Sequence, residues 1–122
     1  MPRSPIDRLR RLCLSLPDTY EKLSHGEPTF WAGKRMFASF ADAHNHHGAG
    51  RHAVWCKATH VTQRLLIDKD PDRYFNPPYA GVAGWVGIYL EMTPDWKAVE
   101  DRLRHAHELA LSASKSRTHK KK

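Results

Sequence analysis

The sequence has no hydrophobic run long enough to cross a membrane. A membrane-spanning helix needs about 20 consecutive apolar residues, and no stretch of this 122-residue chain approaches that length. The N-terminal segment MPRSPIDRLRRL also lacks the apolar core and the small-residue cleavage site of a secretory signal. We therefore expect a cytoplasmic protein with one hydrophobic core and no membrane partner.

Cysteine is scarce, and the two residues present, Cys13 and Cys56, form no CxxC motif. So few thiols exclude a disulfide scaffold and favour two buried, reduced cysteines. The best local pair of nucleophile and base is Cys56 with His60. No third residue is placed to orient that histidine, and a cysteine within an apolar strand is usually inert. The sequence thus indicates neither an enzyme nor a cofactor.

The positive charge of the chain is concentrated at its C-terminal end. The chain has 20 Lys and Arg against 13 Asp and Glu, a net charge of +7. Five of the basic residues lie in the segment SASKSRTHKKK, so residues 1–111 carry 15 basic and 13 acidic groups, a net charge of only +2. We expect one domain over residues 1–111 and a disordered basic tail over residues 112–122, because the tail has too little apolar surface to offset its ordering entropy.

Three segments have the period of an amphipathic helix. The signals Ser4-Pro5, Thr59 and Thr93-Pro94-Asp95 predict helix starts, and the helices should end near residues 15, 70 and 113. The predicted inward-facing residues are Ile6, Leu9, Leu12, Cys13 and Leu16 in the first helix, Val61, Leu65 and Leu66 in the second, and Trp96, Val99, Leu103, Ala106 and Ala110 in the third.

Between the first two helices the sequence is typical of antiparallel strands. Short apolar runs lie at residues 20–24, 29–32, 35–41 and 53–58, separated by turn-forming residues. Gly33 predicts a type II′ turn, and in that register Trp31 pairs with Met36 and Phe30 pairs with Phe37.

One more strand is predicted in the uncharged stretch YFNPPYAGVAGWVGIYL, at residues 74–90. Alternation places Val86, Ile88 and Leu90 on its core side. Its other side, which carries Trp85 and Tyr89, is either a shallow aromatic surface or a face that lies under a helix.

A histidine-rich loop precedes the fourth run of apolar residues. His44, His46, His47 and His52 lie within nine residues, and imidazoles so close together are able to bind zinc, nickel or copper. No Cys, Glu or HExxH spacing accompanies them. We therefore expect adventitious metal binding and no native metal site.

The order of these motifs resembles that of the MmcQ/YjbR family of small bacterial proteins. The resemblance spans about residues 6–113 and is carried by the segment LPDTYEKLSHGEPTFWAGKRMFASF, by Lys57 at the end of VWCK, by the corner YFNPPY, by the strand GWVGIYLE and by the segment DWKAVEDRLRHAHELA. It implies an α+β, CyaY-like fold in the order α-β(3-4)-α-β-α, with a single antiparallel sheet of about five strands packed on one face by helices.

The resemblance also implies a double-wing mode of DNA binding. The wings would be the hairpin tip Gly33–Arg35, where Lys34 matches the Gly-Lys turn of the family, and the loop His44–His52. The predicted nucleic-acid-binding residues are Lys34, Arg35, Arg51, His52 and Lys57, and the binding should be insensitive to base sequence.

The alternative is a non-catalytic protein that binds a small molecule or another protein on the open face of its sheet. Its predicted ligand-binding residues are Trp31, Tyr79, Trp85 and Tyr89, since exposed aromatic surface often marks an interface.

Overall fold

The computed structural model describes residues 4–42, 51–90 and 94–120, with side chains through residue 113. The helices are α1 (Pro5–Leu14), α2 (His60–Lys69) and α3 (Trp96–Lys120), and a short 3₁₀ helix, η2, spans Ala80–Ala83. The strands are β1 (Thr19–Ser24), β2 (Glu27–Ala32), β3 (Arg35–Ala41), β4 (Ala53–Cys56), β5 (Tyr74–Phe75) and β6 (Val86–Tyr89).

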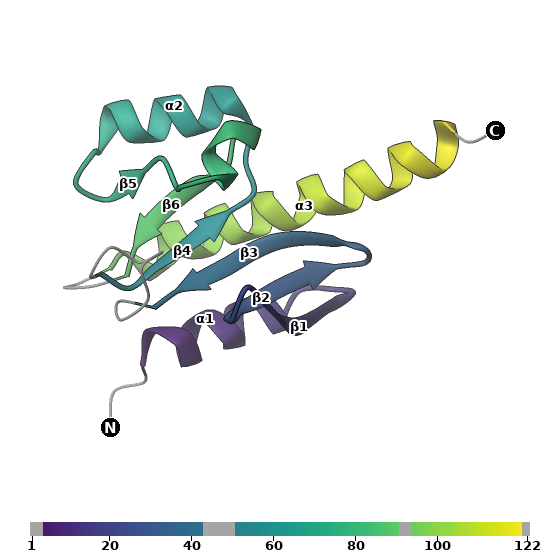
Figure 1. Cartoon of the computed structure of the whole chain (residues 1–122), viewed down its shortest axis with the longest axis horizontal. Coiled ribbons are helices and arrows are strands. Elements are labelled where there is room, and N and C mark those ends of the chain that lie inside the picture. Colours follow the sequence, from purple (N-terminus) through teal and green to yellow (C-terminus); the bar gives the residue numbers. More distant parts are fainter. Residues whose placement is uncertain (1–3, 43–50, 91–93, 121–122) are drawn as a thin grey trace.

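The strands form one antiparallel sheet in the order β1-β2-β3-β4-β6-β5 (Figure 1). α1 and α3 pack on one face of this sheet, and α2 lies beside β5 at one edge. The predicted α+β class with a single antiparallel sheet is therefore confirmed. The two-residue strand β5 is an addition that the sequence did not predict.

Side-chain caps fix where the helices begin. Ser4 Oγ accepts a hydrogen bond from the Asp7 amide at 3.3 Å, and Thr59 Oγ1 accepts one from the Thr62 amide at 3.1 Å, as predicted. The capping oxygen of α3 belongs to Asp95, which accepts from the Ala98 amide at 3.2 Å.

The third helix is longer than predicted. The sequence placed its end near residue 113, whereas α3 continues to Lys120. No Gly or Pro lies between those positions to interrupt the helical hydrogen bonds. The disorder expected of residues 112–122 stays a prediction.

The core lies between the sheet and the helices α1 and α3. Val86, Ile88 and Leu90 are each at most 2% exposed, which confirms the predicted core side of β6. The helices contribute Leu9, Cys13, Val99, Leu103, Ala106 and Ala110, all buried as predicted. A hydrogen bond connects α3 to the segment between α1 and β1: the His107 Nε2 lies 2.7 Å from the Pro17 carbonyl oxygen.

The hairpin of β2 and β3 contains a bulge that changes the predicted register. Trp31 pairs with Met36 as expected, but Phe30 pairs with Ala38 and not with Phe37. Phe37 is the extra residue of the bulge, fully buried, with its ring 5.6 Å from that of His107. The bulge buries Phe37 and Ala38 together, which strict alternation along β3 would not allow.

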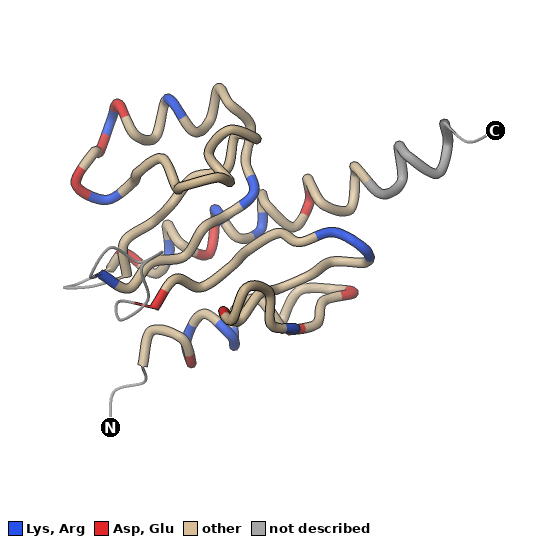
Figure 2. The backbone as a smooth tube through the Cα atoms, viewed as in Figure 1, with Lys and Arg blue, Asp and Glu red and all other residues tan. Residues whose placement is uncertain are grey.

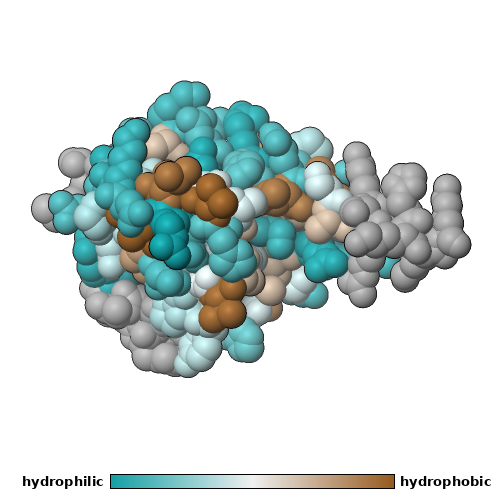
Figure 3. All heavy atoms as spheres, turned by 90° about the horizontal axis from the view of Figure 1, so that it is seen from above, coloured by the Kyte–Doolittle hydropathy of each residue, from teal (hydrophilic) through white to brown (hydrophobic). Residues whose placement is uncertain are grey.

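The inward face of α2 also differs from the prediction. Val61 is 70% exposed and Leu65 is 63% exposed, whereas Leu66 and Ile67 are partly buried against the core. The reason is that α2 lies at the edge of the sheet beside β5 and does not cover the main core. Hydrophobic side chains consequently reach the surface on the side of the molecule that carries α2 (Figure 3).

Gly87 is required by the close packing of Phe75 on the sheet. A Cβ atom at position 87 would lie 2.2 Å from Cζ of Phe75. We predict that Gly87→Ala lowers the free energy of unfolding by about 1–3 kcal/mol, the usual cost of overpacking. Urea denaturation measures this change. The same substitution made in a Phe75→Ala background should cost far less, and an equal loss in both backgrounds would contradict the explanation.

Candidate functional site

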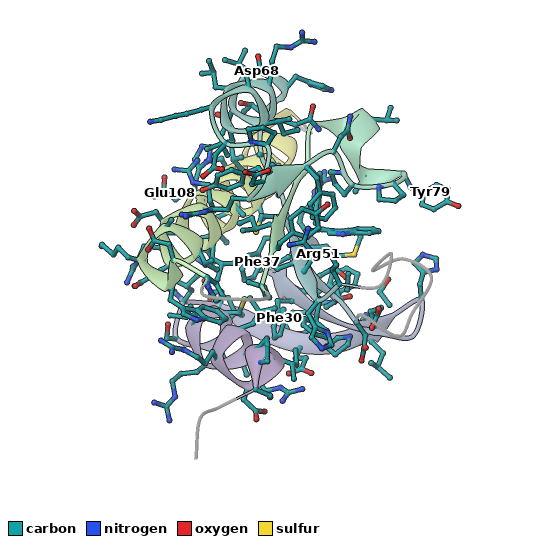
Figure 4. All side chains as sticks on the ribbon, turned by 90° about the vertical axis from the view of Figure 1, so that its left-hand side faces the viewer. Phe30, Phe37, Arg51, Asp68, Tyr79 and Glu108 are labelled. Carbon is teal, nitrogen blue, oxygen red and sulfur yellow. The ribbon has the colours of Figure 1, made fainter. Side chains whose placement is uncertain are left out.

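No described helix covers the face of the sheet that lies opposite α3, which we call the open face. Paired residues share a face, so the register places Thr29, Ser39, Trp55 and Gly87 side by side on it. In Figure 4, α3 lies to one side of the sheet and Tyr79 projects from the other side. Aromatic side chains on this face are therefore not under a helix.

The open face is hollowed into a cavity of about 660 Å³, which we call the open-face groove. It has an aromatic wall, a methionine, and a more polar end near the turn between β1 and β2. Its lining residues are Ser24, His25, Glu27, Met36, Ser39, Phe40, Ala41, Trp55, Tyr79, Ala80 and Trp85.

The strand register gives the groove a direction. Thr29 pairs with Ser39, so Glu27 and Ala41 lie two residues further along their strands at one end. Met36 lies toward the other end, together with Trp85, which directly precedes β6. Four residues along a strand span about 14 Å, which sets the approximate length of the groove.

The polar end of the groove is built by a tight turn. His25 and Gly26 have φ values of 54° and 80°, the backbone of a two-residue type I′ hairpin loop, and Gly at the second position suits this conformation. The turn brings Ser24 opposite Glu27. Glu27 is only 7% exposed, and one oxygen of its carboxylate accepts a hydrogen bond from the Asp42 amide at 3.0 Å.

Tyr79 lines the groove from a strained backbone. Its φ of 64° and ψ of −58°, with a hydrogen bond of 2.6 Å from the Ala80 amide to the Pro78 carbonyl, form a tight three-residue γ-turn. Such a conformation costs about 1–3 kcal/mol in a residue other than glycine and is concentrated at functional sites. The side chain is nevertheless 82% exposed, so burial of the Tyr79 ring does not account for the strain.

Tyr89 and Trp31, on the same face, are covered by other side chains. The ring of Tyr89 stacks on Phe75 at 4.5 Å and lies under the Arg51 guanidinium at 3.6 Å. Trp31 lies under the Lys22 ammonium, 4.5 Å from the ring centre. Of the four predicted ligand-binding residues, Tyr79 and Trp85 thus line the groove, whereas Trp31 and Tyr89 do not.

Sequence reasoning did not name Met36, Trp55 or Glu27 as ligand-binding residues. Trp55 and Met36 come from separate strands, and only the pairing of β3 with β2 and β4 brings them to one face. Glu27 was assigned to a turn, and no local pattern marks it as a buried carboxylate. The pair His25-Gly26 is the one local feature of the sequence that indicated a turn at this end of the groove.

The structure divides the predicted nucleic-acid-binding residues between the two ends of the sheet. Lys34 and Arg35 form the tip of the β2–β3 hairpin, and Lys57 follows β4 at that same end, where its amide bonds to the Phe37 carbonyl. Arg51 precedes β4 at the opposite end, about 20 Å away along an extended chain. Figure 2 shows Lys and Arg at both ends of the sheet.

The cations at the hairpin end affect one another. Burial lowers the pKa of Lys57, and the charge of Arg35 lowers it further. At the other end, His52 Nδ1 lies 3.9 Å from Asp42 Oδ1, and the His52 ring stacks on Phe40 at 5.7 Å. Lys34, Arg35 and Lys57 therefore form a group of cations at the hairpin end, whereas among the described residues Arg51 and His52 lie at the other end.

The described residues contain no group of three metal-ligating side chains, and none of their helices is both long and apolar enough to span a bilayer. His44, His46 and His47 lie outside the described residues.

The thiol of Cys56 is fully buried, and this burial raises its pKa to about 12. His60 is exposed, and its Nε2 lies 2.8 Å from the Val82 carbonyl oxygen. The pair of nucleophile and base considered from the sequence is therefore not formed.

Comparison with known proteins gives one family and one fold. A family model described as YjbR matches residues 14–109. Among solved structures, the chain is similar to the Deinococcus radiodurans protein DR2400, whose domain is described as DUF419. The TM-score is 0.72 and the identity 20%, over 88% of this chain and 81% of that chain. No curated protein matches the chain.

We predict that neither cysteine reacts as a free thiol in the folded protein. Burial raises the pKa of both Cys13 and Cys56, so the reactive thiolate is suppressed at neutral pH, and the core also blocks access. Labelling with iodoacetamide at pH 7.5 should be at least about tenfold slower than for a free thiol, and urea should restore the full rate. Native labelling of Cys56 as fast as a free thiol would contradict this.

Proposed function

This chain belongs to the YjbR family, and we propose that it is a non-catalytic binding protein whose ligand lies in the open-face groove. The observation that carries the proposal is a cavity of about 660 Å³ with the rings of Trp55, Tyr79 and Trp85 in its wall. Small-molecule sites are typically cavities of about 300–1,000 Å³ with mostly apolar linings and a few polar groups. The groove matches that description in volume and in lining.

The arrangement of the polar groups supports binding over catalysis. The Ser39 hydroxyl lies 3.1 Å from the Thr29 hydroxyl, so it is engaged with another hydroxyl and not with a base. The buried Cys56 thiol is on the helix side of the sheet, away from the groove. A nucleophile needs an adjacent base to be activated, and these two candidates lack one.

The strain at Tyr79 supports the location of the site. Folding alone would favour a glycine at this φ, because the ring gains little burial there. Tyr79 lines the groove, and strained residues of this kind are concentrated at functional sites.

We predict that a neutral apolar dye, N-phenyl-1-naphthylamine, binds the groove with a large rise in fluorescence. Trp85→Ala should weaken this binding about tenfold or more, because the ring forms part of the groove wall and truncating it removes apolar contact. The matched control is Trp96→Ala, which removes the same side chain from α3, outside the groove. Absence of dye binding, or equal losses in the two variants, would overturn the proposal.

A second candidate function is DNA binding that does not depend on base sequence. It is favoured by the grouping of Lys34, Arg35 and Lys57 at the hairpin end of the sheet. Such a group of cations attracts phosphate, and the resulting affinity falls steeply with salt. Arg51 and His52, at the opposite end, do not join this group.

For this second function we predict a shift of duplex DNA in a native gel at about 50 mM salt. Lys34→Glu should weaken the binding and lower the dependence of log K on log salt by about one unit, the share of one phosphate contact. Lys97→Glu is the control, because its side chain is 79% exposed on α3 and carries the same charge. Equal effects of the two substitutions, or no shift at low salt, would rule out binding at the hairpin end.

A further inference from the structure

Among the described residues that line the open-face groove, Glu27 supplies the one carboxylate, at the polar end, and none is Lys or Arg; His25 is the one imidazole. The grouped cations Lys34, Arg35 and Lys57 lie at the other end of the sheet. A positive group that enters the groove near Glu27 therefore meets a carboxylate, and the nearest grouped cations lie at the far end of the sheet, while Arg51 at the Glu27 end lies over the Tyr89 ring.

The burial of Glu27 makes a positive charge beside its carboxylate favourable. The residue is only 7% exposed, and removing a carboxylate from water is costly unless hydrogen bonds or an opposite charge offset the loss. Within the described part of the chain, its carboxylate takes one hydrogen bond, from the Asp42 amide, and forms no ion pair. A bound cation would supply what this single hydrogen bond does not.

The aromatic wall attracts the same kind of ligand. The faces of Trp and Tyr rings are negative and attract cations, most strongly when water is excluded. The protein already uses this attraction on the open face, where Lys22 lies over Trp31 and Arg51 lies over Tyr89. The groove combines the rings of Trp55, Tyr79 and Trp85 along its wall with one carboxylate at its polar end, a lining that suits a ligand with an alkylated ammonium group and an apolar body.

We infer that the ligand of the open-face groove is a small organic cation with an alkylated ammonium group at the Glu27 end and an apolar body that extends toward Met36 and Trp85. This inference rests on the proposed function, because it names the ligand class of the same groove. The groove length of about 14 Å accommodates such a head and body. The volume of about 660 Å³ lies within the range of small-molecule sites.

The test compares two molecules of the same shape that differ in charge. (4-Hydroxyphenyl)trimethylammonium and 4-tert-butylphenol compete with N-phenyl-1-naphthylamine for the groove, and the anion 4-hydroxyphenylacetate serves as a third competitor. We expect the cation to displace the dye at a concentration at least about tenfold lower than its neutral isostere, and the anion to be the weakest of the three. Equal potency of the cation and the neutral molecule, or a stronger anion, would overturn the inference.

A single isosteric variant assigns the preference to Glu27. Glu27→Gln keeps an oxygen that can accept from the Asp42 amide but removes the charge. In this variant the dye should still bind, and the cation and the neutral 4-tert-butylphenol should displace it at nearly equal concentrations. A preference for the cation as large as in the unaltered protein would contradict the role of Glu27. The comparison on the unaltered protein stands even where this variant does not fold. Dye binding without cation preference refutes this inference alone, whereas absence of dye binding refutes the proposed function itself.

Discussion

The packing of α3 against one face of the sheet is the interaction on which the rest of the structure depends. Val99, Leu103, Ala106 and Ala110 bury one side of the helix against the strands, and the bulge at Phe37 adds an aromatic ring to the same layer. Each fully buried aliphatic or aromatic side chain contributes about 1.5–3 kcal/mol by leaving water. Because the described helices do not add a layer on the other side, the open face needs another means of shielding its apolar side chains.

The protein shields the open face with its own side chains at the margins and leaves the middle hollow. Phe75 packs over Gly87 and stacks on Tyr89, and Lys22 lies over Trp31. Between these covered margins lie Trp55 and Trp85, whose rings line a cavity. The groove is thus a consequence of covering a six-stranded sheet on one face only. Its specific features, a buried carboxylate and a strained tyrosine, do not follow from that constraint, which is why we assign them to ligand binding.

The sequence predicted the features of the fold that depend on local periodicity. The core side of β6, the buried stripes of α1 and α3 and the caps Ser4 and Thr59 follow from the spacing of residues and from short-range hydrogen bonds. The family resemblance is confirmed as well, since it was carried by the order of such local motifs. The prediction failed where tertiary packing decides: the bulge at Phe37 depends on α3, and the exposed face of α2 depends on its place at the sheet edge.

The site was predictable only in part for the same physical reason. Tyr79 and Trp85 stand out in the sequence because they belong to a Pro-rich aromatic corner, whereas Glu27 and Met36 gain their places through strand pairing between segments that carry no motif.

The central claim, that the groove binds a ligand, is tested most directly by the indole N–H signals of the four tryptophans in a nitrogen–proton correlation spectrum. On titration with 4-tert-butylphenol or its trimethylammonium counterpart, the signals of Trp55 and Trp85 should shift saturably while that of Trp96 stays in place. Unchanged Trp55 and Trp85 signals, or shifts confined to Trp96, would contradict the account.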